Sequence, residues 1–329
     1  MSKERSKAKV DRTLLPSQTG YQEISSTLCI GLDIAWFGGS EGDPRSKYDF
    51  LAAAFLNPAL ETSKIGYLRV PLNDHDLDAA QTSAVLKNLI EEYVGRANRI
   101  VLAIDAPLQA IDRDLPKRMP RPKRGNVQRR ACDVDLNWKR KEIDSLCGGA
   151  QEWHPNIQPG APLAPRVECL LDKLSRTFVT WTREHSDHPH LIIECFPAEA
   201  IWAAKRMGWF APEIRASDAK EYKNKKGKRL TAMEVERIIQ EVLLPFRNVC
   251  AKICWNTIVR EVLSHILADS GWRDGESYRG GKMLDDVVDS MLCLATAISY
   301  AVGNAHVWQD RDDVDDGHII GPGVMHNHF

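Results

Sequence analysis

The stretch LCIGLDIAWF, residues 28–37, is apolar at almost every position, and Asp33 is its one charged residue. A strand with one solvated face alternates apolar and polar residues, whereas a strand covered on both faces is continuously apolar. The turn-forming residues Gly38, Gly39 and Ser40 follow it. The stretch therefore predicts the central strand of an α/β sheet, with a carboxylate near its end.

The segments that follow predict the rest of the sheet and its helices. Two short apolar runs, 48–56 and 64–71, predict a meander of three strands together with the first. An amphipathic helix is expected at 77–94, and two further buried strands, 99–107 and 191–197, are apolar until an acid and then a proline. Helical periodicity predicts the remaining helices at residues 166–184, 231–244, 257–268 and 284–302.

The length of 329 residues is ordinary for one α/β domain with insertions. We expect a flexible N-terminal arm at residues 1–26, one domain at 27–322 with an insertion at about 110–188, and a tail at 323–329. The net charge is −1, so any preference for a polyanion has to come from local charge. The sequence contains neither a signal peptide nor an apolar run of about 18 residues, which predicts a cytoplasmic protein without a membrane partner.

Three carboxylates lie within the late run KMLDDVVDSMLCLA, residues 282–295. At 3.6 residues per turn, Asp286 and Asp289 share one face of a helix, and Asp285 lies nearly as close to Asp289. Like charges at this spacing cost a few tenths of a kcal/mol, so a cation is expected beside them. The simpler interpretation of Asp285 is an N-terminal helix cap.

Acids also end the predicted strands, as Asp33, Asp105 and Glu194. Each of them alone has a structural interpretation, as a cap, a turn residue or the partner of an arginine. Functional groups collect at the carboxyl ends of central strands, however, so these acids are expected to converge. The predicted order of elements is that of the ribonuclease H-like fold: three antiparallel strands, a helix, a strand, a helix, a strand and then helices. In that fold, acids of the first strand, the fourth strand and a C-terminal helix meet around metal.

Two basic segments suggest a polyanionic partner. Residues 113–141 carry eleven Lys and Arg against three Asp, and a second basic run spans residues 220–229. Such segments would hold phosphates near the acids, and Trp138 or Tyr222 could stack on a base. Alternatively, the basic segments are solvated loops without a ligand, or they bind a nucleotide or a small phosphorylated substrate. The candidate substrate-binding residues are Arg129, Arg130, Lys223, Lys228 and Arg229.

Several motifs occur together in a fixed order: GLD at 31–33, AIDAP at 103–107, RACD at 130–133, ECFPAE at 194–199, YK at 222–223, GKR at 227–229, DDVVD at 285–289 and GHIIGP at 317–322. In this combination the chain resembles, over residues 28–322, the prokaryotic family called domain of unknown function 429. That family is described as predicted nucleases of ribonuclease H-like fold. The chain departs from it at Ser290, where the family usually has alanine.

The resemblance implies a mixed five-stranded sheet flanked by helices, with a large basic and helical insertion. It also implies that Asp33, Asp105, Asp286 and Asp289 are metal ligands, with Glu194 as a further catalytic acid.

The sequence thus predicts a metal-dependent nuclease. It would hydrolyse phosphodiester bonds of DNA or RNA with Mg²⁺ or Mn²⁺ and a metal-activated water. One alternative is an ATP-dependent phosphotransferase of the actin and sugar-kinase type, which shares the core fold and the glycine-flanked Asp strand. The other is a non-catalytic module that binds nucleic acid or protein. The choice between DNA and RNA and the oligomeric state stay open.

Overall fold

The computed structural model describes residues 25–34, 48–59, 62–71, 79–93, 95–106, 108, 163–182, 184–214, 222–223, 230–250, 252–268, 278–308 and 318–323. Most of the predicted arm, of the basic insertion and of the tail lies outside these residues.

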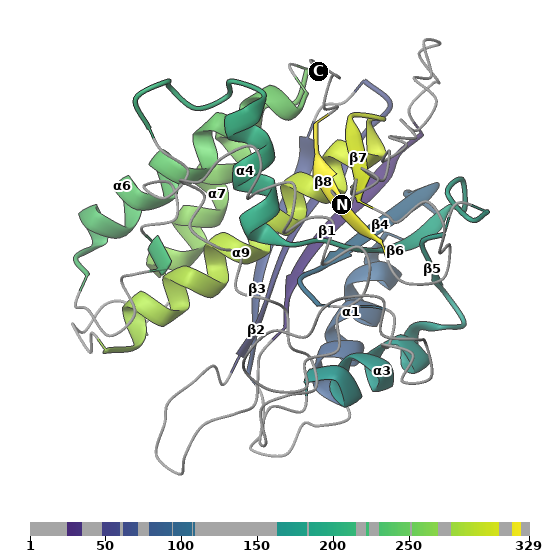
Figure 1. The fold of residues 1–329 in the computed structure, drawn as a ribbon. Coiled ribbons are helices and arrows are strands. Elements are labelled where there is room, and N and C mark those ends of the chain that lie inside the picture. Colours follow the sequence, from purple (N-terminus) through teal and green to yellow (C-terminus); the bar gives the residue numbers. More distant parts are fainter. Residues whose placement is uncertain are drawn as a thin grey trace, which may run out of the picture.

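A mixed sheet of six strands forms the centre of the molecule (Figure 1). The strand order is β3-β2-β1-β4-β6-β5, in which β1, β2 and β3 are antiparallel neighbours and β1, β4, β6 and β5 run parallel. The predicted mixed α/β sheet is confirmed, and a two-residue strand, β5, adds a sixth strand to the predicted five. The strands are β1 (Thr27–Asp33), β2 (Tyr48–Leu56), β3 (Thr62–Pro71), β4 (Arg99–Ile104), β5 (Val179–Thr180) and β6 (His190–Glu194).

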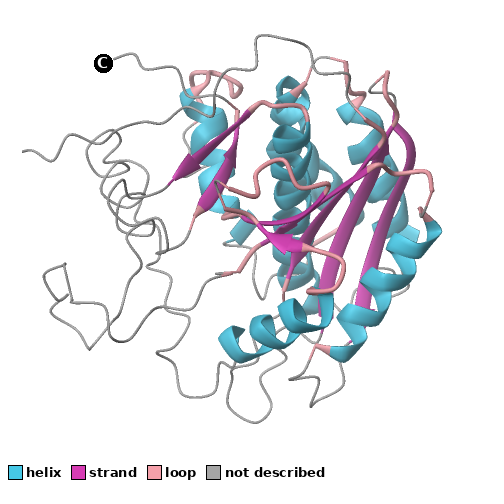
Figure 2. Cartoon of the chain, turned by 90° about the vertical axis from the view of Figure 1, so that its right-hand side faces the viewer, coloured by secondary structure: helices cyan, strands magenta, loops and turns pink. Residues whose placement is uncertain are grey.

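Helices cover both faces of this sheet, which gives three layers (Figures 1 and 2). Two helices lie on one face, α1 (Ala80–Glu92) and α3 (Leu163–Leu174). The other face carries α4 (Pro197–Arg206), α6 (Ala232–Leu243), the 3-10 helix η2 (Leu244–Val249), α7 (Trp255–Ala268) and α9 (Tyr278–Ala301). A hairpin of β7 (Ala305–Trp308) and β8 (Ile319–Pro322) follows α9, and Ile320 forms an isolated bridge with Cys195 beyond β6.

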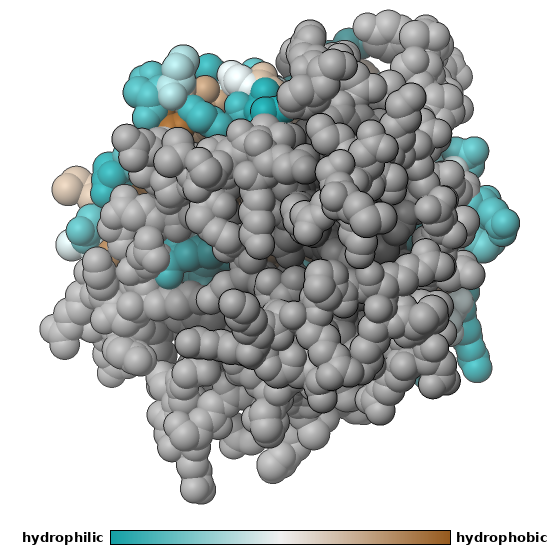
Figure 3. All heavy atoms as spheres, in the orientation of Figure 1, coloured by the Kyte–Doolittle hydropathy of each residue, from teal (hydrophilic) through white to brown (hydrophobic). Residues whose placement is uncertain are grey.

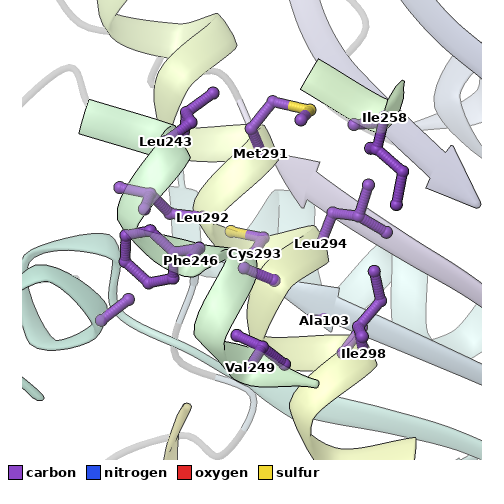
Figure 4. Packing of buried hydrophobic residues seen from close by; sticks show 14 of the residues in the cluster. Ala103, Leu243, Phe246, Val249, Ile258, Met291, Leu292, Cys293, Leu294 and Ile298 are labelled. Atoms are coloured by element: carbon purple, nitrogen blue, oxygen red, sulfur yellow. The ribbon is translucent and has the colours of Figure 1, made fainter. Parts of the chain in front are cut away.

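The central strand β1 explains the layered core, because its residues alternate between two apolar clusters. Leu28, Ile30 and Leu32 pack with α1 and α3, whereas Cys29 packs with α9 and its neighbours. Helix α9 is buried along residues 284–300, and Figure 4 shows its apolar side chains packed against residues of α7 and η2. The continuous apolar character of residues 28–34 therefore follows from cover on both faces.

Gly31 lets α9 lie directly on β1. A Cβ atom added at this position would stand 2.2 Å from the backbone nitrogen of Leu294 and 2.2 Å from the carbonyl oxygen of Ser290. Real Cβ atoms do not approach backbone so closely, so only glycine allows this contact. The close approach fixes the height of α9 above the end of β1, where Asp33 lies.

A buried ion pair joins the second strand to helix α3. The guanidinium of Arg166 donates two parallel hydrogen bonds to the carboxylate of Asp49, at 2.9 Å and 2.6 Å, and both side chains are fully buried. Thr82 of α1 donates a third hydrogen bond to Asp49 and accepts one from Arg166 at 3.1 Å. The network therefore ties β2, α1 and α3 together on one face of the sheet.

Three predictions about local structure are wrong or incomplete. The helix expected at 166–184 ends at Leu174. The chain turns there because the backbone N–H and the hydroxyl of Ser175 donate to the carbonyl of Asp172, and later N–H groups donate to the carbonyl of Leu174. The β-branched residues of β5 then pair with β6. Asp285 is no helix cap, since α9 begins two turns earlier at Tyr278. The sequence interpretation also missed α4, which starts with Pro197 at a position that suits proline.

Outward-facing residues of the described chain are mainly polar. In the view of Figure 3 the coloured surface is largely hydrophilic, and the exposed large apolar side chain among the described residues is Met233 of α6, at 78%. None of the helices among those residues has the length and apolar content needed to cross a bilayer. The cytoplasmic location stays a prediction.

Candidate functional site

Two of the predicted acids stand side by side at the carboxyl end of the sheet. Strands β1 and β4 are parallel neighbours, and the backbone N–H of Asp105 donates to the carbonyl of Leu32 at 2.9 Å. Asp33 and Asp105 therefore continue the two strands at the same level. Alternation along each strand turns both side chains toward α9, because Cys29 and Ala103 belong to the apolar cluster on that face. Each residue is only 9% exposed.

Helix α9 brings two further carboxylates to the same place. Asp289 and Asp285, at 5% and 2% exposure, lie one turn apart and both act electrostatically on Asp105. Cys293 lies one turn further along α9, and the charges of both Asp105 and Asp33 raise the pKa of its thiol. The acids of β1, β4 and α9 thus surround one region under the helix. The predicted ligand Asp286 is 3% exposed in the same helix, next to Asp285.

Lys223 brings a positive charge into this cluster. Its ammonium lies 2.6 Å from Oδ2 of Asp289 and 3.6 Å from Oδ1 of Asp285. The neighbouring Tyr222 donates its hydroxyl to Oδ1 of Asp289 at 2.6 Å. Tyr222 is 1% exposed, so the predicted stacking of its ring on a base is wrong for this conformation. Lys223, predicted to bind substrate, forms an ion pair inside the acid cluster in this structure.

The electrostatics of the cluster follow from burial of several like charges. Burial raises the pKa of Asp105 well above its ordinary value, the charge of Asp289 raises it further, and Lys223 lowers it. The pKa of Asp289 is also raised by burial, against the lowering effect of Lys223. Oδ1 of Asp105 is buried and has no hydrogen-bond partner among the described residues. A buried carboxylate oxygen without a donor is costly, so this position suits a cation or a hydrogen-bond donor.

We define the acid cluster as Asp33, Asp105, Asp285 and Asp289. Its donor chemistry fits a hard divalent cation, since it offers carboxylate oxygens from two strands and one helix. As the side chains stand, no group of three or more His, Cys, Asp or Glu residues in the described ranges is arranged around one metal position. Lys223 accounts for part of this arrangement, because it draws two of the four carboxylates to its own ammonium.

Glu194 lies beside the acid cluster and has a different environment. It pairs in register with Ile104, whose side chain packs on the α1 and α3 face, and its Oε2 accepts the backbone N–H of Leu108 at 3.0 Å. Together with Thr180 and His318 it lines a cavity of about 10 Å³, which has room for roughly one water molecule. Glu194 still raises the pKa of Asp105. This geometry favours a positioning acid that holds the chain after β4 in place.

A pair of thiols closes the cluster on the side of the core. Cys195 follows β6 and forms a side-chain hydrogen bond with Cys293 of α9. Burial raises the pKa of both thiols, so neither is poised to ionise. These residues pack α9 against the strand ends, and the cysteines among the described residues are free.

The remaining candidate residues Arg129, Arg130, Lys228 and Arg229 lie outside the described residues, as do Trp138 and most of both basic segments. The sequence interpretation missed Asp285 as a member of the cluster. Its signal was present, because Asp285 and Asp289 are four residues apart and share a helix face.

The raised pKa of Asp105 predicts how stability depends on pH in metal-free protein. Above the ordinary value of 3.8, the unfolded chain has lost a proton that the folded protein still holds at Asp105. Stability should therefore fall as the pH rises from that value through the raised pKa. In Asp105→Asn this loss should be absent. We expect the variant to be more stable than the wild type at about pH 8 in EDTA and to have a flatter profile, measured by urea unfolding from about pH 5 to 8.

The matched control is Asp172→Asn, since Asp172 is an exposed residue of α3. It should leave the slope of the pH profile unchanged. A wild-type slope in Asp105→Asn would show that this carboxyl does not titrate as described.

Comparison with known proteins adds nothing to this geometry. The resemblance to the family called domain of unknown function 429 stays a prediction. No family model, no curated protein and no solved structure matches the chain.

Proposed function

We propose that the protein is a metal-dependent nuclease with a ribonuclease H-like fold, and that the acid cluster is its active site. The observation that carries the proposal is the meeting of carboxylates from β1, β4 and α9 around Asp105, whose buried Oδ1 lacks a hydrogen-bond partner among the described residues. The strand order β3-β2-β1-β4-β6 supports the fold assignment, because it places the first and fourth strands side by side at the centre.

Asp33, Asp105 and Asp289 would hold Mg²⁺ or Mn²⁺, with Asp285 as a further ligand. Such ions, when bound, supply charge stabilisation to a phosphodiester and lower the pKa of a water that serves as nucleophile. The chain's own contribution is positioning. Tyr222 fixes one oxygen of Asp289 by a hydrogen bond, and burial excludes bulk water from the carboxylates. Glu194 would orient the segment after β4 through the backbone N–H of Leu108.

Nucleic acid is the proposed substrate because positive charge follows the site in the sequence. The segment 113–141 begins shortly after Asp105 and carries eight more positive than negative side chains, counted as eleven Lys and Arg against three Asp. A phosphate backbone is the polyanion that such a segment binds, with a steep dependence on salt.

A non-catalytic binding module is the second candidate function. The observation that favours it is Lys223, since an ammonium that neutralises part of the acid cluster reduces the need for a metal ion. The phosphotransferase alternative gains no specific support from the described residues.

A cleavage assay tests the proposal. Labelled single-stranded, duplex and branched DNA and RNA are incubated with the protein in Mn²⁺, in Mg²⁺ and in EDTA. We expect cleavage in metal only, and we expect Asp105→Asn and Asp289→Asn to fall to the EDTA background, because each removes a charged ligand. Asp172→Asn, on the exposed side of α3, should cut like the wild type.

Equal cleavage by wild type, Asp105→Asn and Asp289→Asn would point to a contaminating nuclease. Binding of the same nucleic acids that survives EDTA, without cleavage, would favour the binding module.

A further inference from the structure

Residues 222–223 engage both oxygens of the one carboxylate that has most influence on Asp105. Tyr222 donates to Oδ1 of Asp289 at 2.6 Å, and the ammonium of Lys223 lies 2.6 Å from Oδ2. The same ammonium reaches toward Oδ1 of Asp285 at 3.6 Å. Two consecutive residues therefore hold the α9 half of the acid cluster.

The ammonium and a divalent cation require the same oxygen atoms. An ammonium binds a carboxylate through N–H donors, and a hard metal ion binds it through the same oxygen lone pairs. An oxygen at 2.6 Å from Nζ already accepts one bond, so a divalent ion on its second lone pair would stand beside the ammonium. Electrostatic repulsion between two cations so close together favours departure of the ammonium.

One ammonium does not neutralise the cluster. Four aspartates converge there, and Lys223 contacts two of them. Oδ1 of Asp105 still has no hydrogen-bond partner in the part of the chain that is described. The cluster therefore retains a demand for positive charge that a doubly charged ion meets better than Lys223.

The side chain of Lys223 has a route out of the cluster. It is 34% exposed, whereas the side chains of Asp285 and Asp289 are 3% and 6% exposed. Lysine carries its charge on a flexible stem of four carbons, so the ammonium can reach solvent without movement of α9. The carboxylates, in contrast, are fixed by their helix.

We propose that Lys223 is a resident counter-cation that closes the acid cluster and leaves Asp289 when a divalent metal ion binds. The inference rests on the proposed function and adds a regulatory step to it. Lys223 stabilises the metal-free protein and weakens the affinity for metal. After displacement, its ammonium lies on the solvent side of the site, where it can meet a phosphate of the substrate.

Calorimetric titration with Mn²⁺ alone tests the displacement. Lys223→Met removes the charge and keeps the length of the side chain, so we expect Mn²⁺ to bind about tenfold or more tightly than to the wild type, by the usual strength of close charge pairs. Lys223→Arg keeps the charge and should not gain affinity. Lys87→Met, at an exposed position of α1, is the matched control and should bind Mn²⁺ like the wild type.

Thermal unfolding gives a second readout that does not depend on activity. Without metal, Lys223→Met should unfold at a lower temperature than the wild type, because the acids lose their counter-cation. Saturating Mn²⁺ should raise its unfolding temperature by more than it raises that of the wild type. If Lys223→Met does not fold without metal, Lys223→Gln replaces it.

The outcomes separate the inference from the proposed function. Equal or weaker Mn²⁺ affinity in Lys223→Met, with wild-type binding intact, overturns the displacement and leaves the nuclease proposal standing. Binding of Mn²⁺ to Lys223→Met but not to the wild type would show that Lys223 excludes the metal and is not displaced by it, which overturns the inference and argues against a metal-dependent activity of the wild type. Absence of Mn²⁺ binding in every variant overturns both.

Discussion

Replacement of Arg166 by alanine is expected to lower the free energy of unfolding by about 3–5 kcal/mol, the cost of leaving a buried charge without its partner. Asp49 is fully buried, and its two bidentate hydrogen bonds come from this guanidinium. The hydrogen bond from Thr82 remains, but one neutral hydroxyl does not offset a buried carboxylate. Urea unfolding at neutral pH measures the loss.

Two further variants show whether the loss comes from the unpaired charge. The double variant Arg166→Met with Asp49→Leu removes both charges and should recover most of the lost stability. Arg237→Ala breaks a pair with Glu241 in which both side chains are more than half exposed, and it should cost about 0.5 kcal/mol or less. A loss as small in Arg166→Ala as in Arg237→Ala would contradict the buried network.

Gly31→Ala is expected to destabilise the protein by about 3 kcal/mol or more, at the upper end of the range for overpacking. Alanine ordinarily suits the inside of a strand at least as well as glycine, so strand propensity alone predicts no loss of stability. The close approach of α9 to β1 outweighs propensity here, because the new Cβ would stand 2.2 Å from backbone atoms of Leu294 and Ser290. Helix α9 has to move away, and Asp289 moves with it. Urea unfolding measures the stability, and calorimetry measures the accompanying loss of Mn²⁺ affinity.

Gly303→Ala serves as the glycine control. Gly303 has a φ of +73° and nothing within 4 Å of an added Cβ, so only backbone strain of about 1–2 kcal/mol applies there. Mn²⁺ affinity should stay at the wild-type value in Gly303→Ala. A Gly31→Ala protein that retains both stability and Mn²⁺ affinity would show that α9 does not rest on β1 at this point.

Much of the fold could be predicted because its strands are covered on both faces. Continuous apolar runs gave the position of β1, the bounds of β2 and the acid at the end of β4. The two-residue strand β5 and the hairpin of β7 and β8 could not be found in this way. They are too short for a periodic signal, and their pairing depends on the placement of β6 and α9.

Two details of the candidate site depend on packing and could not be predicted. The sequence places Asp285 and Asp286 next to each other, and only the structure shows that Asp285 acts on Asp105 and lies 3.6 Å from the ammonium of Lys223. Lys223 lies in a basic run, which predicts a solvated side chain. Its inward turn follows from the burial of Tyr222 and its bond to Asp289, and neither is visible in a local pattern.

The contact between β1 and α9 has a consequence for synthesis of the protein. These elements lie at opposite ends of the described chain, and the contact between them is among the most extensive in the fold. A domain grows from its N-terminus on the ribosome, so the β1 face stays uncovered until the late helix emerges. Pairing across such a sequence separation is slow. The nascent chain therefore exposes an apolar face of the sheet until α9 has emerged, and dependence on a chaperone is expected because β1 and α9 lie so far apart in the sequence.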